Sequence, residues 1–297
     1  MCEPPTQPPV LRLRLMLCPV KSIDECRAPM ITPHIPAHKF WLGDEAIYYL
    51  LARPALKRSF DHVWFAQYGP RPDPQRGPYI FYLNHSAWWD GYMMMLIHRA
   101  IMHRAFDSYL MMEERQLRAY RFFTWCGAFS VNRHDPEDAQ RAQIYAANLL
   151  RERRDRALYI FPQGRIEAND YRPLTIYPGI ARIAALVRDV TLCPIALRYE
   201  FLGQQWPHAF IQIGPPHPPA SRDDIEAIRA DIATHLTDAV DRLRADVIEQ
   251  RLGTFQPLLV GRWGIDRIWD TVRGWFRRGG ADDGPAAAAA NRLRARA

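Results

Sequence analysis

Residues 79–91 read Tyr79-Ile80-Phe81-Tyr82-Leu83-Asn84-His85-Ser86-Ala87-Trp88-Trp89-Asp90-Gly91, and this stretch decides the fold. Its first five side chains are apolar or aromatic, which predicts a buried strand, and residues 92–102 follow as a predicted helix. His85 therefore lies where a strand passes into a helix, the usual place for site residues in α/β proteins. Five residues on, the carboxylate of Asp90 can orient an imidazole that takes up a proton near neutral pH.

The spacing of His85 and Asp90 is not specific by itself. With ten histidines and 21 aspartates in 297 residues, chance places an Asp five positions after a His about 0.7 times. A histidine of the core or the surface is the more common explanation of one such pair. The rest of the chain must decide whether the pair carries out chemistry.

Predicted strands and helices alternate along the chain. The expected strands are 109–112, 128–131, 158–161, 190–199 (interrupted at Pro194) and 209–213. The expected helices are 115–125, 136–150, 178–187 and a long helix to residue 250 capped by Ser221, with one or two amphipathic helices, broken near Pro54, in 40–65. This order predicts an α/β fold with a mixed, largely central β-sheet flanked by helices, and amphipathic terminal helices.

One domain with terminal appendages is expected. It covers residues 39–250, with a motif-bearing core at 79–215. Residues 1–38 are Pro-rich without a helical period, so we expect weak order there, and Met16 or Met30 could be the true start. Residues 251–278 are expected to form a basic amphipathic helix, with five Arg against two Asp across 262–278, and residues 279–297 a disordered tail.

Composition narrows the class of protein. The formal charge is +7 and there are only three lysines, so arginine, which binds phosphate through a bidentate fork, supplies nearly all the positive charge. These arginines are mixed with acidic residues and no nucleic-acid-binding motif is present, so no nucleic-acid partner is expected. The five cysteines lack paired spacing, which indicates reduced thiols. No uncharged apolar run reaches the ~18 residues of a membrane span.

Four blocks in order resemble the motifs of the glycerolipid acyltransferase family, whose best-known members acylate lysophosphatidic acid. The blocks are Asn84–Asp90, Gly127–Arg133, Phe161–Arg165 and Val190–Ile195. Each block is weak by itself, whereas four in order at suitable distances are specific. The resemblance covers residues 79–215, less than half of the chain.

The resemblance implies transfer of a fatty acyl group from an acyl-coenzyme A or acyl-carrier-protein thioester to the hydroxyl of a lysophospholipid or related lipid. It implies that His85 is the general base, that Asp90 orients the His85 imidazole, and that Arg133 binds the acceptor. Gly164 is the candidate for the oxyanion contact, because a backbone N–H at a glycine turn can approach closely; a glycine needed only for a tight turn is the alternative. We expect no bound cofactor and no metal.

The third block departs from the family pattern Phe-Pro-Glu-Gly-Thr-Arg. Gln163 replaces the glutamate, Arg165 replaces the threonine, and Ile166 stands at the position of the arginine. We expect Gln163 and Arg165 to bind the acceptor, Arg165 to point to the opposite side of an extended segment from the usual arginine, and Glu167 to point elsewhere. A non-phosphorylated acceptor and an inactive lipid-binding homologue remain alternatives, and a hydrolase would need water in the place of the acceptor hydroxyl, or a nucleophile such as Ser86.

The location follows from the acceptor. An enzyme whose acceptor and product lie in a bilayer benefits from lying on it, so we expect a peripheral protein on the cytoplasmic face of the membrane, partly cytosolic. Membrane surface lipids and an acyl-carrier protein are the expected partners. The basic segment 262–278 is the first candidate for membrane contact, and the segment 40–65 is the second.

Overall fold

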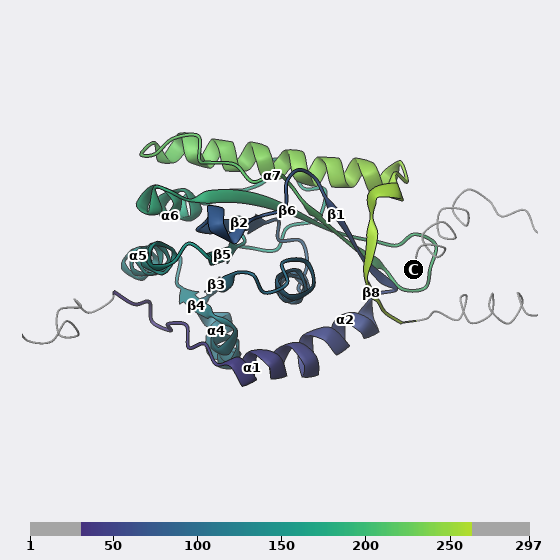
Figure 1. Ribbon diagram of the computed structural model, residues 1–297, viewed down its shortest axis with the longest axis horizontal. Helices are drawn as coiled ribbons and strands as arrows, with labels where there is room; N and C mark the ends of the chain where they lie inside the picture. The colour runs from purple at the N-terminus through teal and green to yellow at the C-terminus, as the bar shows by residue number, and fades with distance from the viewer. Residues whose placement is uncertain (1–30, 263–297) are drawn as a thin grey trace, which may run out of the picture. The chain divides into compact units, whose positions relative to one another are not determined.

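The computed structural model describes residues 31–262, and an eight-stranded mixed sheet forms its centre (Figure 1). The strand order is β4-β3-β5-β2-β6-β7-β1-β8. The strands are β1 (His62–Gln67), β2 (Tyr79–Leu83), β3 (Asp107–Glu113), β4 (Ala128–Val131), β5 (Arg156–Ile160), β6 (Thr191–Glu200), β7 (His208–Ile213) and β8 (Gln256–Val260). The five strands from β4 to β6 run parallel, whereas β7 is antiparallel to β6 and β8 is antiparallel to β1.

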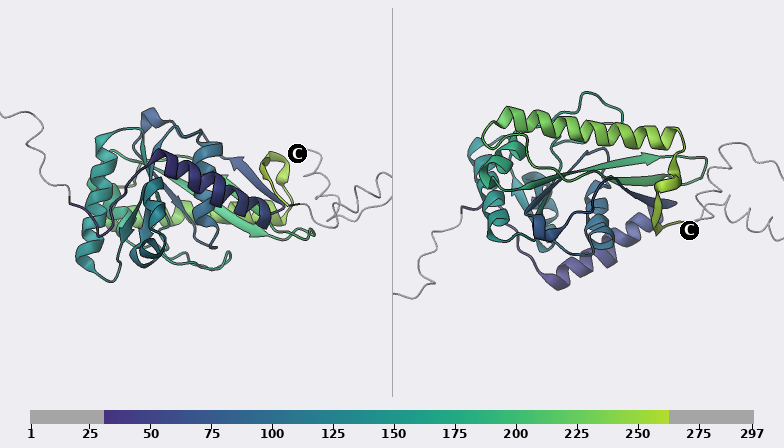
Figure 2. Two further views of the ribbon diagram at one scale, coloured as in Figure 1. Left: turned by 90° about the horizontal axis from the view of Figure 1, so that it is seen from below. Right: turned by 45° about the horizontal axis from the view of Figure 1, so that its top comes forward.

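Helices cover both faces of this sheet. One face carries α5 (Pro136–Glu152), α6 (Gly179–Val187) and α7 (Ile225–Ile248). The other carries α1 (Trp41–Ala46), the π-helical turn η2 (Ile47–Ala52), α2 (Arg53–Ser59), α3 (Asp90–Leu96) and η4 (Ile97–Ile101). Figure 2 shows α1 and α2 in purple, lying across the sheet on the side away from α7. The expected α/β fold with a mixed central sheet between helices is therefore confirmed.

Strand β2 divides the core between these two layers. All five of its side chains are buried, as expected for a strand with parallel neighbours on both sides. Ile80 and Tyr82 belong to the cluster under α5, α6 and α7, whereas Phe81 and Leu83 belong to the cluster under α1 to α3. Successive side chains of a strand point to opposite faces, so one short apolar run anchors both layers.

The structure corrects the expected elements between residues 40 and 65. The chain stays helical from Trp41 to Ser59, because Pro54 falls in the first turn of α2, where its missing N–H costs little. Residues 63–65, expected in a helix, belong to β1, which pairs with β7 and β8. The run His62-Val63-Trp64-Phe65 is rich in the β-branched and aromatic residues that strands favour.

Two further boundaries differ from expectation. Strand β6 is not interrupted at Pro194, because its ladder with β7 begins only at Ile195. The long helix α7 begins after Asp224 rather than after Ser221: the Asp224 carboxylate accepts hydrogen bonds from the N–H groups of residues 226 and 227, both at 3.0 Å. The Ser221 hydroxyl instead accepts from the Asp224 N–H at 3.1 Å.

The chain ends are only partly described. Of residues 1–38, expected to be weakly ordered, Ile35 is buried; its N–H donates to Ser130 Oγ and its carbonyl accepts from the Ser130 N–H, both at 2.9 Å. Of the helix expected over 251–278, residues 252–260 instead form the 3₁₀ turn η6 (Leu252–Thr254) and β8. Residues 1–30, residues 263–278 of that predicted helix and the predicted tail lie outside the described residues. No helix within 31–262 is long and apolar enough to cross a membrane.

Asn84 fixes the end of β2 to its neighbour. Its side chain is buried, and its Oδ1 accepts from the Leu197 N–H at 2.7 Å while its Nδ2 donates to the Leu197 carbonyl at 2.9 Å. The amide thereby replaces one residue of strand pairing at the point where β2 ends. The following residue, His85, starts from a backbone position that β6 determines.

We expect Asn84→Ala to lower the free energy of unfolding by about 2 to 4 kcal/mol, because it leaves the buried N–H and C=O of Leu197 unpaired. Urea denaturation followed by circular dichroism measures this change. Asn148→Ala is the matched control: Asn148 is half-buried on α5, and its replacement should change stability by no more than about 0.5 kcal/mol. Equal effects of the two substitutions would contradict the role of Asn84.

Candidate active site

The structure brings His85 and Asp90 together. The Nδ1 atom of His85 lies 2.7 Å from Oδ2 of Asp90. A carboxylate only accepts, so Nδ1 carries the proton and the lone pair of the neutral ring is on Nε2. The ring stacks on Phe161 with 4.6 Å between centroids, and its side chain remains one-fifth exposed. A base with a fixed tautomer and an accessible nitrogen is therefore present.

The Asp90 carboxylate is fully buried and surrounded by donors. Besides the His85 ring, Oδ2 accepts from the N–H groups of Ser86 at 2.7 Å and Ala87 at 2.9 Å. The Tyr199 hydroxyl donates to Oδ1 at 2.5 Å. Burial, and then the charge of Asp90, raise the pKa of Tyr199 well above its ordinary value, so the phenol keeps the proton that it donates. Four donors compensate the buried charge, and the first turn of α3 favours a negative group.

Gln163 forms a hydrogen bond with the backbone of His85. Its Oε1 accepts from the His85 N–H at 2.6 Å, and its Nε2 donates to Oε2 of Glu167 at 2.5 Å. The Glu167 N–H in turn donates to the His85 carbonyl at 2.9 Å. Gln163, which was expected to bind the acceptor, is buried and does not line the cavity beside His85. Its side chain positions the backbone of His85.

Glu167 also lies closer than expected. The backbone turns at Gly164, with φ of +61°, and this bend returns residue 167 toward residue 163. Although burial raises the pKa of Glu167, hydrogen bonds from Gln163, Arg165 and Thr175 outweigh it and hold this pKa below its usual value. Its charged form is therefore the stable one near neutral pH. The carboxylate lost at position 163 is thus present four residues later.

The turn after Phe161 requires a glycine at position 164. A positive φ favours glycine, and a Cβ atom here would lie 2.5 Å from Nη1 of Arg133. The Gly164 N–H already donates to the Phe161 carbonyl at 3.0 Å, so in this conformation the turn occupies the donor that was predicted for the oxyanion. The alternative, a glycine required for a tight turn and a close approach, describes this geometry.

A cavity of about 660 Å³ opens beside His85. Its lining includes five aromatic side chains, Trp88, Tyr92, Tyr120, Phe122 and Phe123. Three arginines also line it, Arg133, Arg165 and Arg182. An elongated apolar group and an anionic group can therefore bind next to the same histidine.

Two of the three arginines were named as candidates from the sequence, and the third was not. Arg133, expected to bind the acceptor, pairs with Glu113 at 3.2 Å and lies over the ring of Tyr177. Arg165 was expected on the opposite side, but it lines the same cavity because its segment is a turn rather than extended. Arg182 was missed, although it is the one charged residue in the α6 sequence Gly179-Ile180-Ala181-Arg182-Ile183-Ala184-Ala185-Leu186-Val187.

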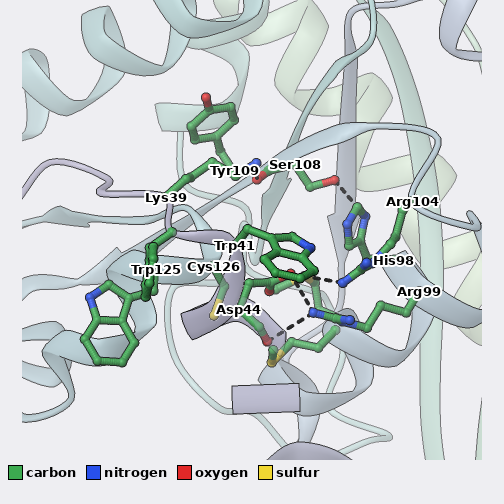
Figure 3. Close-up of a pocket in the computed structure, with 13 residues that line it drawn as sticks. Lys39, Trp41, Asp44, His98, Arg99, Arg104, Ser108, Tyr109, Trp125 and Cys126 are labelled. Atoms are coloured by element: carbon green, nitrogen blue, oxygen red, sulfur yellow. Dashed lines mark hydrogen bonds and ion pairs between the residues drawn. The ribbon is translucent and has the colours of Figure 1, made fainter. Parts of the chain in front are cut away.

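A second cavity, of about 310 Å³, lies beside α1 and η4 and shares no lining residue with the first (Figure 3). Burial lowers the pKa of His98 to about 4, and the Nδ1 of this ring contacts Ser108 Oγ at 3.0 Å. Burial also raises the pKa of the Cys126 thiol to about 12, so it is not a thiolate near neutral pH. Arg99 is already paired with Asp44 and Glu45. These groups do not form a catalytic set.

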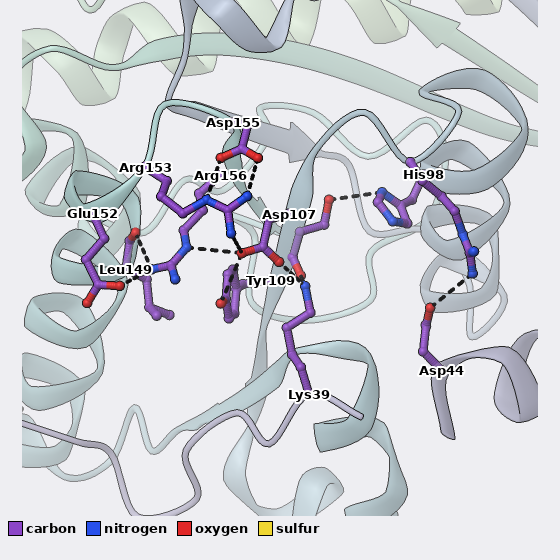
Figure 4. A network of polar contacts seen from close by, with 12 residues as sticks. Lys39, Asp44, His98, Asp107, Tyr109, Leu149, Glu152, Arg153, Asp155 and Arg156 are labelled. Carbon is purple, nitrogen blue, oxygen red and sulfur yellow. Dashed lines mark hydrogen bonds and ion pairs between the residues drawn. The ribbon is translucent and has the colours of Figure 1, made fainter. Parts of the chain in front are cut away.

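An ion-pair network centred on Asp107 borders that region (Figure 4). The Asp107 carboxylate accepts from Lys39 and from Arg156 Nε at 3.1 Å, and Arg153 lies 3.7 Å away. Burial raises the pKa of Asp107, but Lys39 and Arg156 outweigh this effect and lower it overall. The network links the start of β3 to the start of β5 and to the segment before α1, which is a structural role.

Restoring the family's glutamate is expected to destabilise this chain. Gln163→Glu would place two carboxylates in contact in a buried turn, which raises the pKa of one above its unfolded value. The free energy of unfolding then falls as pH rises from the unfolded pKa of that carboxyl to its raised pKa in the folded protein. The variant should therefore unfold more easily at pH 8 than at pH 5, with a loss of about 1.4 kcal/mol per unit of pKa shift. Urea denaturation at both pH values measures it.

The double variant Gln163→Glu/Glu167→Gln is the control, because it exchanges the amide and the carboxylate while keeping one charge. It should recover most of the stability of the unmodified chain at pH 8. A single variant as stable as the unmodified protein at pH 8 would show that residues 163 and 167 are not coupled.

Comparison with known proteins finds a family whose profile matches the part of the chain that carries these residues. The profile of the Acyltransferase family matches residues 65–198, a range that contains both members of the His85–Asp90 pair and all three cavity arginines. No curated protein matches the sequence. Among solved structures, the 1-acyl-sn-glycerophosphate (LPA) acyltransferase, PlsC, from Thermotoga maritima matches with a TM-score of 0.47 and 16% identity, over 68% of this chain and 80% of that chain. The family match over residues 65–198 confirms the resemblance seen in the four blocks.

Proposed function

We propose that the protein transfers a fatty acyl group from an acyl-coenzyme A or acyl-carrier-protein thioester to the hydroxyl of a lysophospholipid or related lipid. The observation that carries the proposal is the His85–Asp90 pair, 2.7 Å apart, beside a cavity with an aromatic wall and three arginines. The match to the acyltransferase family supports the class of reaction.

The proposed chemistry uses the chain's own base. Nε2 of His85 accepts the proton of the acceptor hydroxyl while the oxygen attacks the thioester carbonyl. The tetrahedral intermediate collapses, the new C–O bond remains, the C–S bond breaks, and the imidazolium returns its proton to the leaving thiolate. The buried charge of Asp90 stabilises the imidazolium between these steps. The acceptor itself attacks, so the enzyme needs no nucleophile.

The arginines favour an anionic acceptor. Arg133 and Arg165 each have an acidic neighbour, Glu113 and Glu167, whereas the Arg182 side chain has no ion-pair partner among residues 31–262. The cavity therefore keeps a positive charge that a phosphate group can neutralise. Among the alternatives, this supports a phosphate-bearing acceptor over a neutral alcohol.

Two other functions have less support. An inactive lipid-binding homologue would not need a buried carboxylate with four donors behind an accessible imidazole. A hydrolase using Ser86 would need a base on its hydroxyl, and within the described residues Ser86 Oγ has no hydrogen-bond partner.

We also propose that α1 and η2 rest on a membrane. This continuous helical segment and its N-cap residue Phe40 expose a set of large apolar side chains: Phe40, Trp41, Leu42, Tyr49, Leu50 and Leu51. Trp41 is 67% exposed and Leu50 73%, which is unusual for so many neighbouring apolar residues. Arg53, Lys57 and Arg58 follow on α2 and can attract anionic headgroups. The free thiols Cys126 and Cys193 support the cytoplasmic face.

We expect His85→Ala to lower acyl transfer by about 10²- to 10⁴-fold, the usual contribution of a general base. The measurement is acceptor-dependent thiol release from acyl-coenzyme A with a panel of lyso-acceptors. His134→Ala, which removes an exposed imidazole elsewhere, is the matched control and should retain activity. Undiminished thiol release by His85→Ala would overturn the mechanism, and release without any acceptor would favour hydrolysis.

Trp41→Ser/Leu50→Ser should weaken sedimentation with phosphatidylglycerol vesicles by at least about tenfold, since each buried side chain contributes about 1.5–3 kcal/mol. Phe201→Ser is the matched control, because Phe201 is also 67% exposed but lies in the connection between β6 and β7. Unchanged binding of the double variant would exclude this face and leave the basic segment 262–278.

A further inference from the structure

Three metal-ligating side chains meet beside α7, on the opposite face of the sheet from α1 and α2. Asp231 and His235 are four residues apart on α7, so both lie on the same side of the helix. His217 comes from the connection between β7 and α7, where its backbone exchanges two hydrogen bonds of 2.8 Å with Leu192 at the start of β6. Figure 1 shows that α7 runs along the sheet.

The spacing of the three groups suits a small metal ion. Nδ1 of His217 is 3.5 Å from Oδ2 of Asp231, and Nε2 of His235 is 3.4 Å from Oδ1. One ligand atom from each residue lies within 4.8 Å of the other two. Two ligands bound to a tetrahedral zinc ion at ~2.1 Å are about 3.4 Å apart, close to both of these His–Asp separations, in which the two histidines face different oxygens of Asp231. The same separations are too long for strong direct hydrogen bonds.

A second layer of contacts already orients the ligands. The hydroxyl of Tyr82, from the central strand β2, lies 2.8 Å from Nε2 of His217 and fixes the ring with Nδ1 toward Asp231. Metal-binding histidines are commonly held in this way through their other nitrogen. Oδ2 of Asp231 is buried and has no hydrogen-bond partner in the described part of the chain. An unpaired buried carboxylate oxygen is costly, and a cation would compensate it.

Both nitrogens of the His217 ring have polar neighbours in the metal-free protein. Nδ1 lies 3.0 Å from the Pro218 carbonyl. Metal binding replaces that hydrogen bond, and the ring proton then resides on Nε2, where the Tyr82 oxygen accepts it.

We propose that His217, Asp231 and His235 form a binding site for a divalent transition-metal ion, for which Zn²⁺ is the probe. Two imidazoles and one carboxylate are a borderline ligand set that suits zinc. His235 is 37% exposed, so water can reach the remaining coordination position. The ion would join α7 to the segment that precedes it and to the start of β6. The site is independent of the proposed acyl transfer.

Two other groups of His and acidic residues are less suitable. In Asp61, His62 and His208, both nitrogens of the His208 ring are engaged, by Trp64 Nε1 at 3.1 Å and Gln204 Oε1 at 2.9 Å. In His34, Glu114 and Asp138, the carboxylates already accept from Arg118 and from the Asn132 N–H. Neither group offers three available ligands.

The test uses the full-length, tag-free protein after removal of metal with a chelator. Isothermal titration with Zn²⁺ should show one equivalent bound, and Co²⁺ should give the intense visible absorption of a tetrahedral site with nitrogen and oxygen ligands. Zn²⁺ should also raise the melting temperature. His235→Ala and Asp231→Asn should each bind Zn²⁺ at least tenfold more weakly and lose the melting-temperature increase, whereas His134→Ala should behave as the unmodified protein.

Replacement of a partly exposed residue such as His235 should leave the fold intact, and far-UV circular dichroism of the metal-free variants verifies this. Absence of Zn²⁺ binding by the unmodified protein would overturn the proposal. Retention of one equivalent with unchanged affinity in both variants would also overturn it, because the ion would then bind elsewhere.

Discussion

The structure of the candidate active site depends on the neutralisation of one buried charge. Asp90 has no exposed surface, and its carboxylate is tolerated because an imidazole, two backbone N–H groups and a phenol donate to it. Those donors come from the turn after β2 and from β6, so the charge fixes the turn against the neighbouring strand. The same contacts determine the tautomer of His85. Folding and the orientation of the base are therefore consequences of one electrostatic requirement.

The features that could be predicted from the sequence are those formed by residues close together in the chain. The apolar run of β2, the change to a helix and the interval from His85 to Asp90 all lie within a few consecutive residues. Short-range rules on strand burial and side-chain direction are sufficient to place them. Strands β2 to β7 were predicted for the same reason, since they are apolar runs bounded by turns, whereas β1 and β8 were not predicted. Arg133 was placed by its position in a motif, and the cavity contains it.

The remainder depends on contacts between distant segments. Strand β8 pairs with β1 across nearly 200 residues, and no periodicity in either segment announces that pairing. In the sequence, Arg182 cannot be distinguished from an ordinary exposed arginine of a helix. Its place in the cavity becomes evident only in the structure, where Arg182 and Gly164 line the same cavity. The error over Glu167 arose from treating a turn as an extended segment, in which residues 163 and 167 would be some 13 Å apart. Gly164 has a positive φ, so the chain turns there and brings Glu167 into contact with Gln163.

The connection between α2 and β1 has a mechanical consequence. Only Phe60 and Asp61 separate the two elements, and both are buried. The Phe60 ring stacks on Tyr199 with 5.6 Å between centroids, and Tyr199 donates to Asp90. If α1 rests on a bilayer as proposed, this short buried connection would couple the level of the His85–Asp90 pair to the level of the helix. The acceptor hydroxyl would then have to reach the imidazole at that level to react.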